Sequence, residues 1–104
     1  MAKKLVLICV ANNKIYVEPE WVKLSKTAAD EVEWVCNYSN FSIEFGSDPN
    51  CPFSDPGKWR SGNGNGATNV PFLSGGIKTT AAGPYKYTVR CGALSEDPEV
   101  SIKK

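Results

Sequence analysis

Histidine is absent from this chain of 104 residues, and its one methionine stands at position 1. Without an imidazole, neither a Ser-His-Asp triad nor a Cys-His pair can be assembled. The four cysteines, at positions 9, 36, 51 and 91, show no C-x-x-C spacing. Together with the missing histidine, this spacing argues against a zinc site. We therefore expect a protein that is not an enzyme and that carries no cofactor.

Long apolar runs and an excess of one charge are also absent. The longest apolar run, Leu5–Ala11, has seven residues, far fewer than the roughly 20 that a membrane-spanning helix requires. Twelve basic and eleven acidic residues leave a net charge of +1. This balance gives no electrostatic reason to expect nucleic acid or an anionic membrane as a partner. We expect no nucleic-acid binding and no membrane insertion.

The start of the chain, Met1–Lys4 followed by the apolar run, is faintly similar to a signal peptide. No small-residue cleavage site follows, and residues 12–14 are typical of a turn, so we interpret the run as the first strand. We expect a soluble protein whose compartment the sequence does not assign. A secreted or periplasmic location is open if a signal was removed ahead of Met1.

The pattern that is present has a short period. Apolar and polar residues alternate, and Gly, Pro, Asn or Asp interrupts them every eight to fifteen residues. This pattern favours an all-β sandwich or barrel without helices, and the length favours a single domain over residues 1–104. Strands are predicted at 5–10, 15–17, 21–24, 31–36, 41–45, 85–91 and 100–103, with weaker ones at 68–73 and 76–80, and turns across most of 46–66.

The strands at 31–36 and 85–91 each present one apolar face. The residues predicted to point inward are Val32, Trp34 and Cys36 in the first and Tyr85, Tyr87, Val89 and Cys91 in the second. The run 5–10 is apolar on both faces, which predicts a central or well-covered strand. We assign Trp21, Trp34 and Cys9 to the core. Glu31, Glu33 and Glu44 are expected on outward faces as solvated carboxylates.

Four short motifs follow one another along the chain. They are the proline-containing Val17–Leu24, D-x-V-x-W at Asp30–Trp34, G-x-Y-x-Y at Gly83–Tyr87, and D-P-x-V-x-I at Asp97–Ile102. In this order they resemble the second, third and seventh strands and the C-terminal end of the cupredoxin family. The resemblance implies a Greek-key β-sandwich of seven to eight strands. An immunoglobulin-like sandwich is the alternative, because strand patterns alone separate the two poorly.

The resemblance also says where a copper site would lie. A blue-copper site needs two imidazole nitrogens, one thiolate and usually a weak axial methionine. The first imidazole would stand at Phe41 and the thiolate at Val89, and neither side chain can bind copper. The loop expected to supply the second histidine and the methionine, Cys91–Ser95, contains neither. The resemblance therefore implies the family's fold without its blue-copper site.

The resemblance places Cys36 and Cys91 at the same pole of the sandwich, where copper would be. In an oxidising compartment they could form a disulfide that closes a loop of about 55 residues and stabilises the fold by roughly 4 kcal/mol. Two buried thiols that pack as small apolar groups are the alternative. Cys51 could replace either partner. A Cu(I) site made of the thiolates of Cys36, Cys91 and Cys51 is a third reading, because soft thiolates select that ion.

Three aromatic residues are candidates for a binding surface. Tyr38 and Phe41 fall at a turn near this pole, and Trp59 stands between Lys58 and Arg60 beside the Gly/Asn-rich run. Exposed aromatic rings with polar neighbours are typical of a glycan- or protein-binding face. The alternative is that Phe41 and Trp59 pack against the sandwich, with the charged ends of Lys58 and Arg60 reaching water.

These observations predict a non-enzymatic, monomeric cupredoxin-like module with a binding or structural role. Its ligand would be a protein or a glycan that the sequence does not identify. The alternative function is a metal-handling protein that binds Cu(I) through cysteine thiolates.

Overall fold

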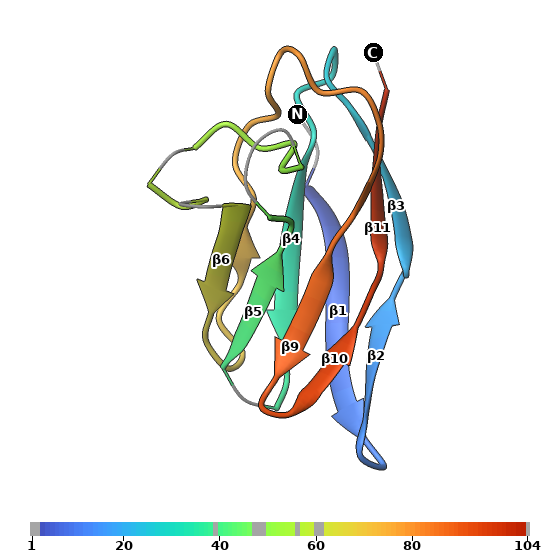
Figure 1. The fold of residues 1–104 in the computed structure, drawn as a ribbon, viewed down its shortest axis with the longest axis vertical. Coiled ribbons are helices and arrows are strands. Elements are labelled where there is room, and N and C mark those ends of the chain that lie inside the picture. The colour runs from blue at the N-terminus through green and yellow to red at the C-terminus, as the bar shows by residue number, and fades with distance from the viewer. Residues whose placement is uncertain (1–2, 39, 47–49, 56, 60–61, 104) are drawn as a thin grey trace.

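The computed structural model describes residues 3–38, 40–46, 50–55, 57–59 and 62–103. These ranges form eleven strands and no α-helix (Figure 1), and no helix in them is long and apolar enough to cross a membrane. The strands are β1 (Lys3–Ala11), β2 (Lys14–Glu18), β3 (Trp21–Ser25), β4 (Glu31–Cys36), β5 (Phe41–Glu44), β6 (Asn63–Gly66), β7 (Phe72–Leu73), β8 (Gly83–Lys86), β9 (Thr88–Cys91), β10 (Leu94–Glu96) and β11 (Glu99–Lys103).

Three hydrogen-bonded sheets make up the two layers of a β-sandwich. The first layer is the sheet β2-β1-β4-β7, in which β1 pairs antiparallel with β2 and parallel with β4. The second layer contains the sheets β10-β9-β5-β6 and β3-β11-β8. These two sheets continue one another, because only Tyr87 separates β8 from β9 and only Asp97 and Pro98 separate β10 from β11. The Tyr87 amide donates to the Pro98 carbonyl at 3.1 Å and joins the two halves.

Most strands lie where the apolar alternation predicts them, and the exceptions are short. The predicted strand 85–91 is interrupted at Tyr87, and β10 is an additional strand. Of the predicted strand 68–73 only Phe72–Leu73 forms, and 76–80 contributes one bridge, between Phe53 and Ile77. Residues 47–49, 56, 60 and 61 of the predicted turn region lie outside the described residues, and so does the prediction for Arg60.

The Gly/Asn-rich run that the sequence predicts as a turn forms strand β6. Its asparagines face outward and its glycines inward. A Cβ atom at Gly64 would lie 2.5 Å from the ring of Phe72, and one at Gly66 would overlap the ring of Phe41. Glycine is required at both positions because aromatic rings occupy the space that a side chain would need.

The core is built around one tryptophan. Trp34 is fully buried, and its indole N–H donates to the Tyr87 hydroxyl at 3.1 Å. Its ring centroid lies 5.7 to 6.1 Å from those of Phe53, Trp59, Phe72 and Tyr87. Aromatic pairs of this kind contribute about 0.5–1.5 kcal/mol each beyond the area that they bury. The two layers are therefore held together by a cluster of aromatic rings.

Trp21 and Cys9 lie outside the core, contrary to the prediction. Trp21 is 50% exposed on the outer face of β3, with the Lys23 ammonium 5.3 Å from its ring centroid. The inward positions of that strand belong to Val22 and Leu24. Cys9 is exposed because β1 turns its even-numbered residues inward. β1 is central in its sheet, as predicted, but its outer face is open to solvent.

Candidate functional site

Two cysteines meet inside the sandwich at the end where β4 and β9 terminate. Cys36 is the last residue of β4 and Cys91 is the last of β9, and both strands run toward the lower end of the molecule in Figure 1. Their Sγ atoms lie 3.8 Å apart, and the side chains are 0% and 2% exposed. Because β4 and β9 belong to different layers, the pair bridges the sandwich. All four cysteines are described, and none forms a disulfide.

Phe41 and Val89 fill the rest of this end. We call the set Cys36, Phe41, Val89 and Cys91 the sulfur pole. Phe41 is 3% exposed and Val89 is fully buried. β5 and β9 pair antiparallel, with Ser42 opposite Arg90. The next residues along the two strands are Phe41 and Cys91, so this register places them side by side. The missing side chain of Gly66 gives the phenyl ring its place, so packed apolar groups close the pole.

The sulfur pole does not fit a blue-copper centre. Phe41 and Val89 stand at the positions implied for an imidazole and a thiolate, and they offer no ligand atom. Within the described ranges, no three histidine, cysteine or acidic side chains converge to hold a metal ion. The ligand atoms that meet between the layers here are the sulfurs of Cys36 and Cys91.

Burial favours the protonated form of Cys91. Loss of water, and after it the neighbouring Cys36 sulfur, raises the pKa of Cys91 from 9.0 to about 12. The thiolate is the form that attacks disulfides and binds metal ions. At neutral pH the Cys91 thiol is therefore the neutral partner in an S–H···S contact across the two layers.

Cys51 does not join the pair. Its side chain is buried, with its Sγ 4.0 Å from the Phe53 carbonyl oxygen. Among the described residues no three cysteine, histidine or acidic side chains gather at one point, so Cys36, Cys91 and Cys51 do not form the three-sulfur Cu(I) site that the sequence offered as a reading.

The structure decides between the two interpretations of the aromatic candidates, and it favours packing for Trp59 and Phe41. Trp59 is 6% exposed, its indole N–H donates to the Ser74 carbonyl at 2.8 Å, and its ring stacks on Phe53 at 5.2 Å. Phe41 is buried in the sulfur pole. Tyr38, at 62% exposure, is the one of the three candidates that can meet a ligand. The predicted loop surface at one pole therefore does not form.

Two of the carboxylates expected to be solvated have structural partners. Glu44 accepts from the Arg90 guanidinium at 2.8 Å, and this bond holds the pKa of Glu44 below its ordinary value. Glu31 accepts from the Gly75 amide at 3.0 Å. Both groups fix neighbouring backbone or strands, and neither faces a second carboxylate in these contacts.

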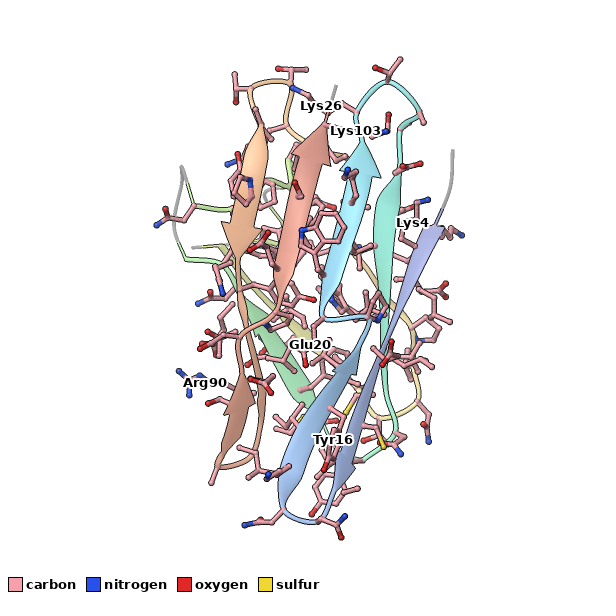
Figure 2. The ribbon with its side chains drawn as sticks, turned by 90° about the vertical axis from the view of Figure 1, so that its right-hand side faces the viewer. Lys4, Tyr16, Glu20, Lys26, Arg90 and Lys103 are labelled. Carbon is pink, nitrogen blue, oxygen red and sulfur yellow. The ribbon has the colours of Figure 1, made fainter. Side chains whose placement is uncertain are left out.

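An apolar surface on the outside of the first layer was not anticipated. Leu5, Leu7 and Tyr16 are 48%, 47% and 50% exposed. Figure 2 shows Tyr16 on β2, at the side of β1. The register sets Tyr16 opposite Cys9, so these side chains form one continuous face of β1 and β2. The sequence does contain a sign that this face is open to water. Charged residues occupy alternate positions of β2 (Lys14, Glu18) and of β4 (Glu31, Glu33), and they lie on the same side of the sheet as Leu5, Leu7 and Tyr16.

Comparison with known proteins shows the fold. No protein-family model matches the chain, and no curated protein sequence matches it. Among solved structures, the chain is similar to a proline-to-glycine mutant of amicyanin in its reduced Cu(I) form at pH 4. The match has a TM-score of 0.55 and 14% sequence identity, and it covers 94% of this chain and 81% of that chain. The protein is therefore a cupredoxin-like β-sandwich.

Proposed function

We propose that this protein is a non-enzymatic cupredoxin-like module that binds another protein and does not transfer electrons through a blue-copper site. The observation that carries the proposal is the chemistry of the sulfur pole. Where copper ligands are implied, this end holds a phenyl ring, an isopropyl group and a pair of buried thiols. These groups join the two layers by packing, so the pole serves the structure.

The outer face of β1 and β2 supports the binding role. Leu5, Leu7 and Tyr16 each leave about half of their surface in water, and a continuous exposed apolar face of this kind is typical of interaction sites. Aliphatic side chains dominate it, with one aromatic ring. This composition suits a protein surface better than a sugar, which would need more polar groups to pair with its hydroxyls.

The thiol pair supports a structural role in an oxidising compartment. Cys36 and Cys91 already face one another across the layers, so a small approach of the two strands suffices for an S–S bond. A small-molecule disulfide would accept the two electrons by thiol–disulfide exchange. The Cys36 and Cys91 thiols then lose their protons as the S–S bond forms, and the oxidant leaves as two thiols.

Handling of Cu(I) is the second candidate function. The two sulfur atoms 3.8 Å apart favour it, since Cu(I) prefers soft sulfur ligands. Binding through thiolates would require Cys91 to lose its proton, and burial opposes that loss, because it raises the pKa of Cys91 to about 12. The site would also rest on two ligands.

A chelator competition separates the two functions. Reduced protein would be titrated with Cu(I) in the absence of oxygen, with bathocuproine disulfonate as the competing chelator. We expect wild type and Cys36→Val to leave equal amounts of Cu(I) with the chelator. Stoichiometric uptake by wild type that Cys36→Val abolishes would overturn the proposal in favour of metal handling.

A thiol count tests the disulfide. Cys9→Ser protein, which lacks the exposed thiol that glutathione would also modify, would be kept with oxidised glutathione, freed of it, denatured without reductant and titrated with a thiol reagent. One of its three cysteines, Cys51, should react, which leaves Cys36 and Cys91 in the disulfide. Three reactive thiols would show that Cys36 and Cys91 stay reduced, and the structural role would then rest on packing alone.

A further inference from the structure

The outer face of the β1–β2 hairpin has a regular arrangement of rows. The antiparallel register sets Leu7 opposite Glu18, Cys9 opposite Tyr16, and Ala11 opposite Lys14. All six side chains are exposed on the outer side of the sheet. We call this set the hairpin face. Each row contributes one residue from each strand, and the middle row contains the large ring of Tyr16.

The hairpin face is sterically accessible to a second sheet. In Figure 1 the turn between β1 and β2 projects beyond the ends of the other strands. Figure 2 views the molecule from the side and shows Tyr16 on β2 in the lower half of the molecule, where the hairpin projects. Another flat surface can therefore stack on the hairpin without meeting the rest of the sandwich.

Opposite charges stand on either side of the middle row. Along β2, Lys14 lies two residues before Tyr16, and Glu18 lies two residues after it. A two-fold axis that runs across the strands, through the row of Cys9 and Tyr16, places Lys14 of one copy over Glu18 of the other, and this happens twice. The same axis sets Ala11 over Leu7. In this arrangement each charged residue of the face meets one of opposite charge and each apolar residue meets an apolar one. An interface with two-fold symmetry requires a surface that matches itself in this way.

Two other axes lack these ion pairs. An axis through the row of Leu7 and Glu18 would place the two Glu18 carboxylates against one another. An axis parallel to the strands and along β1 would lay β2 over β4 and set Glu18 against Val35, according to the registers of β1 with both neighbours. The axis through the row of Cys9 and Tyr16 pairs opposite charges twice, and in that arrangement the strands of the two copies run antiparallel.

We propose that the hairpin face is a homodimer interface, on which a second copy of this chain stacks with its β1 and β2 antiparallel to those of the first. The proposal rests on the proposed function, because it names the protein that the binding module binds, and it departs from the expectation of a monomer. Stacked sheets lie about 10 Å apart. This distance allows Leu7 and Tyr16 of both copies to interdigitate while the two ion pairs form along β2, one on each side of the Tyr16 row.

A charge exchange tests the arrangement. Sedimentation equilibrium would measure the dimer dissociation constant of wild type, Lys14→Glu, Glu18→Lys and the double variant. Each single variant sets two like-charged pairs against one another, so we expect at least a tenfold weaker dimer. The double variant restores opposite charges and should return the dissociation constant to within about threefold of wild type. Lys23→Glu, on the outer face of β3, is the matched control and should change nothing.

Chemical cross-linking tests which residues meet. Cys9 is the exposed cysteine, whereas Cys36, Cys51 and Cys91 are buried. In the proposed dimer the two Cys9 thiols face one another near the axis, and each can add across the double bond of one end of a short bismaleimide. We expect a cross-linked dimer from wild type and the double variant. Cys9→Ser should give none, and Glu18→Lys should give at least tenfold less.

The outcomes separate this inference from the proposed function. A chain that stays monomeric up to its solubility limit, or single variants that the double variant does not rescue, would overturn the dimer. Neither result concerns the sulfur pole. Uptake of Cu(I) by the same samples would overturn the proposed function, whatever the oligomeric state. Unchanged melting temperatures of the variants would show that altered association does not arise from unfolding.

Discussion

Two regions of the sandwich core are packed by different chemistry. In the region around Trp34, on the side away from the sulfur pole, which we call the aromatic end of the core, the rings of Phe45, Phe53 and Trp59 lie with centroids 5.2 to 5.5 Å apart. A hydrogen bond from the Trp59 indole to a backbone carbonyl fixes one of these rings. At the sulfur pole, the corresponding contact between the layers is made by two small thiols, Cys36 and Cys91.

The two ends differ in how their stability responds to pH and to redox conditions. Stacked rings contribute through shape and buried area, which depend little on pH or redox conditions. The thiol pair can be protonated, ionised or oxidised, and each state holds the layers together to a different extent. The aromatic end is therefore the constant part of the fold, and the sulfur pole is the part that its surroundings can adjust.

Removing a ring from the aromatic end should have the largest effect. Trp59→Ala should lower the free energy of unfolding by about 3–5 kcal/mol through the lost packing. It also takes the donor from the buried Ser74 carbonyl, which costs roughly another 1–3 kcal/mol. Urea unfolding would measure both. Trp21→Ala is the matched control, because its ring is half exposed, and it should cost less than about 1 kcal/mol. Equal losses of unfolding free energy in the two variants would contradict the assignment of Trp59 to the core and of Trp21 to the surface.

The aromatic end could be predicted from the sequence only in part. Trp34 follows from strand alternation, since it shares a parity with Val32 and Cys36. Trp59 stands in a segment without periodicity, and nothing local tells whether its ring folds inward. The glycines of β6 are read as turn residues for the same reason. Their role as a strand appears only when the rings of Phe41 and Phe72, far away in the sequence, are in place.

More of the sulfur pole than of the aromatic end can be predicted from the sequence. Cys36 and Cys91 end two strongly alternating strands on their inward faces, and the resemblance to cupredoxins sets both strand ends at one pole. Cys9 and Trp21 were misplaced because an apolar side chain does not reveal which face of a strand is covered. The open side of β1 depends on which elements pack over it, and that is a property of the whole fold.

Oxidation of the thiol pair should have the next largest effect. A disulfide between Cys36 and Cys91 closes a loop of about 55 residues and should add roughly 4 kcal/mol to the free energy of unfolding. Urea unfolding of oxidised and reduced wild type would measure the gain. The same comparison on Cys36→Val should show no gain, because this variant cannot form the bond. If wild type also showed none although its thiol count had fallen by two, strain in the bond would be offsetting the entropic gain.

Alkaline pH should lower the free energy of unfolding through one group at each end, and we expect this effect to be smaller than the two above. Burial raises the pKa of Tyr87, beside the aromatic end, from 10.0 to about 12, and that of Cys91 from 9.0 to about 12. Above their ordinary values, both groups lose protons in the unfolded chain while the folded chain keeps them. The unfolded state then binds fewer protons, so stability is complete below pH 9 and declines between pH 9 and 12.

The oxidised protein has no Cys91 proton to lose, so its decline should begin about one pH unit later and be shallower. Thermal unfolding from pH 8 to 11, with a reductant for the reduced form, would measure both slopes. Tyr87→Phe removes the tyrosine contribution from both forms and should leave the difference between them intact. Identical slopes for oxidised and reduced wild type would mean that the ionisation of Cys91 is not coupled to folding. The contrast between an adjustable and a constant end would then rest on oxidation alone.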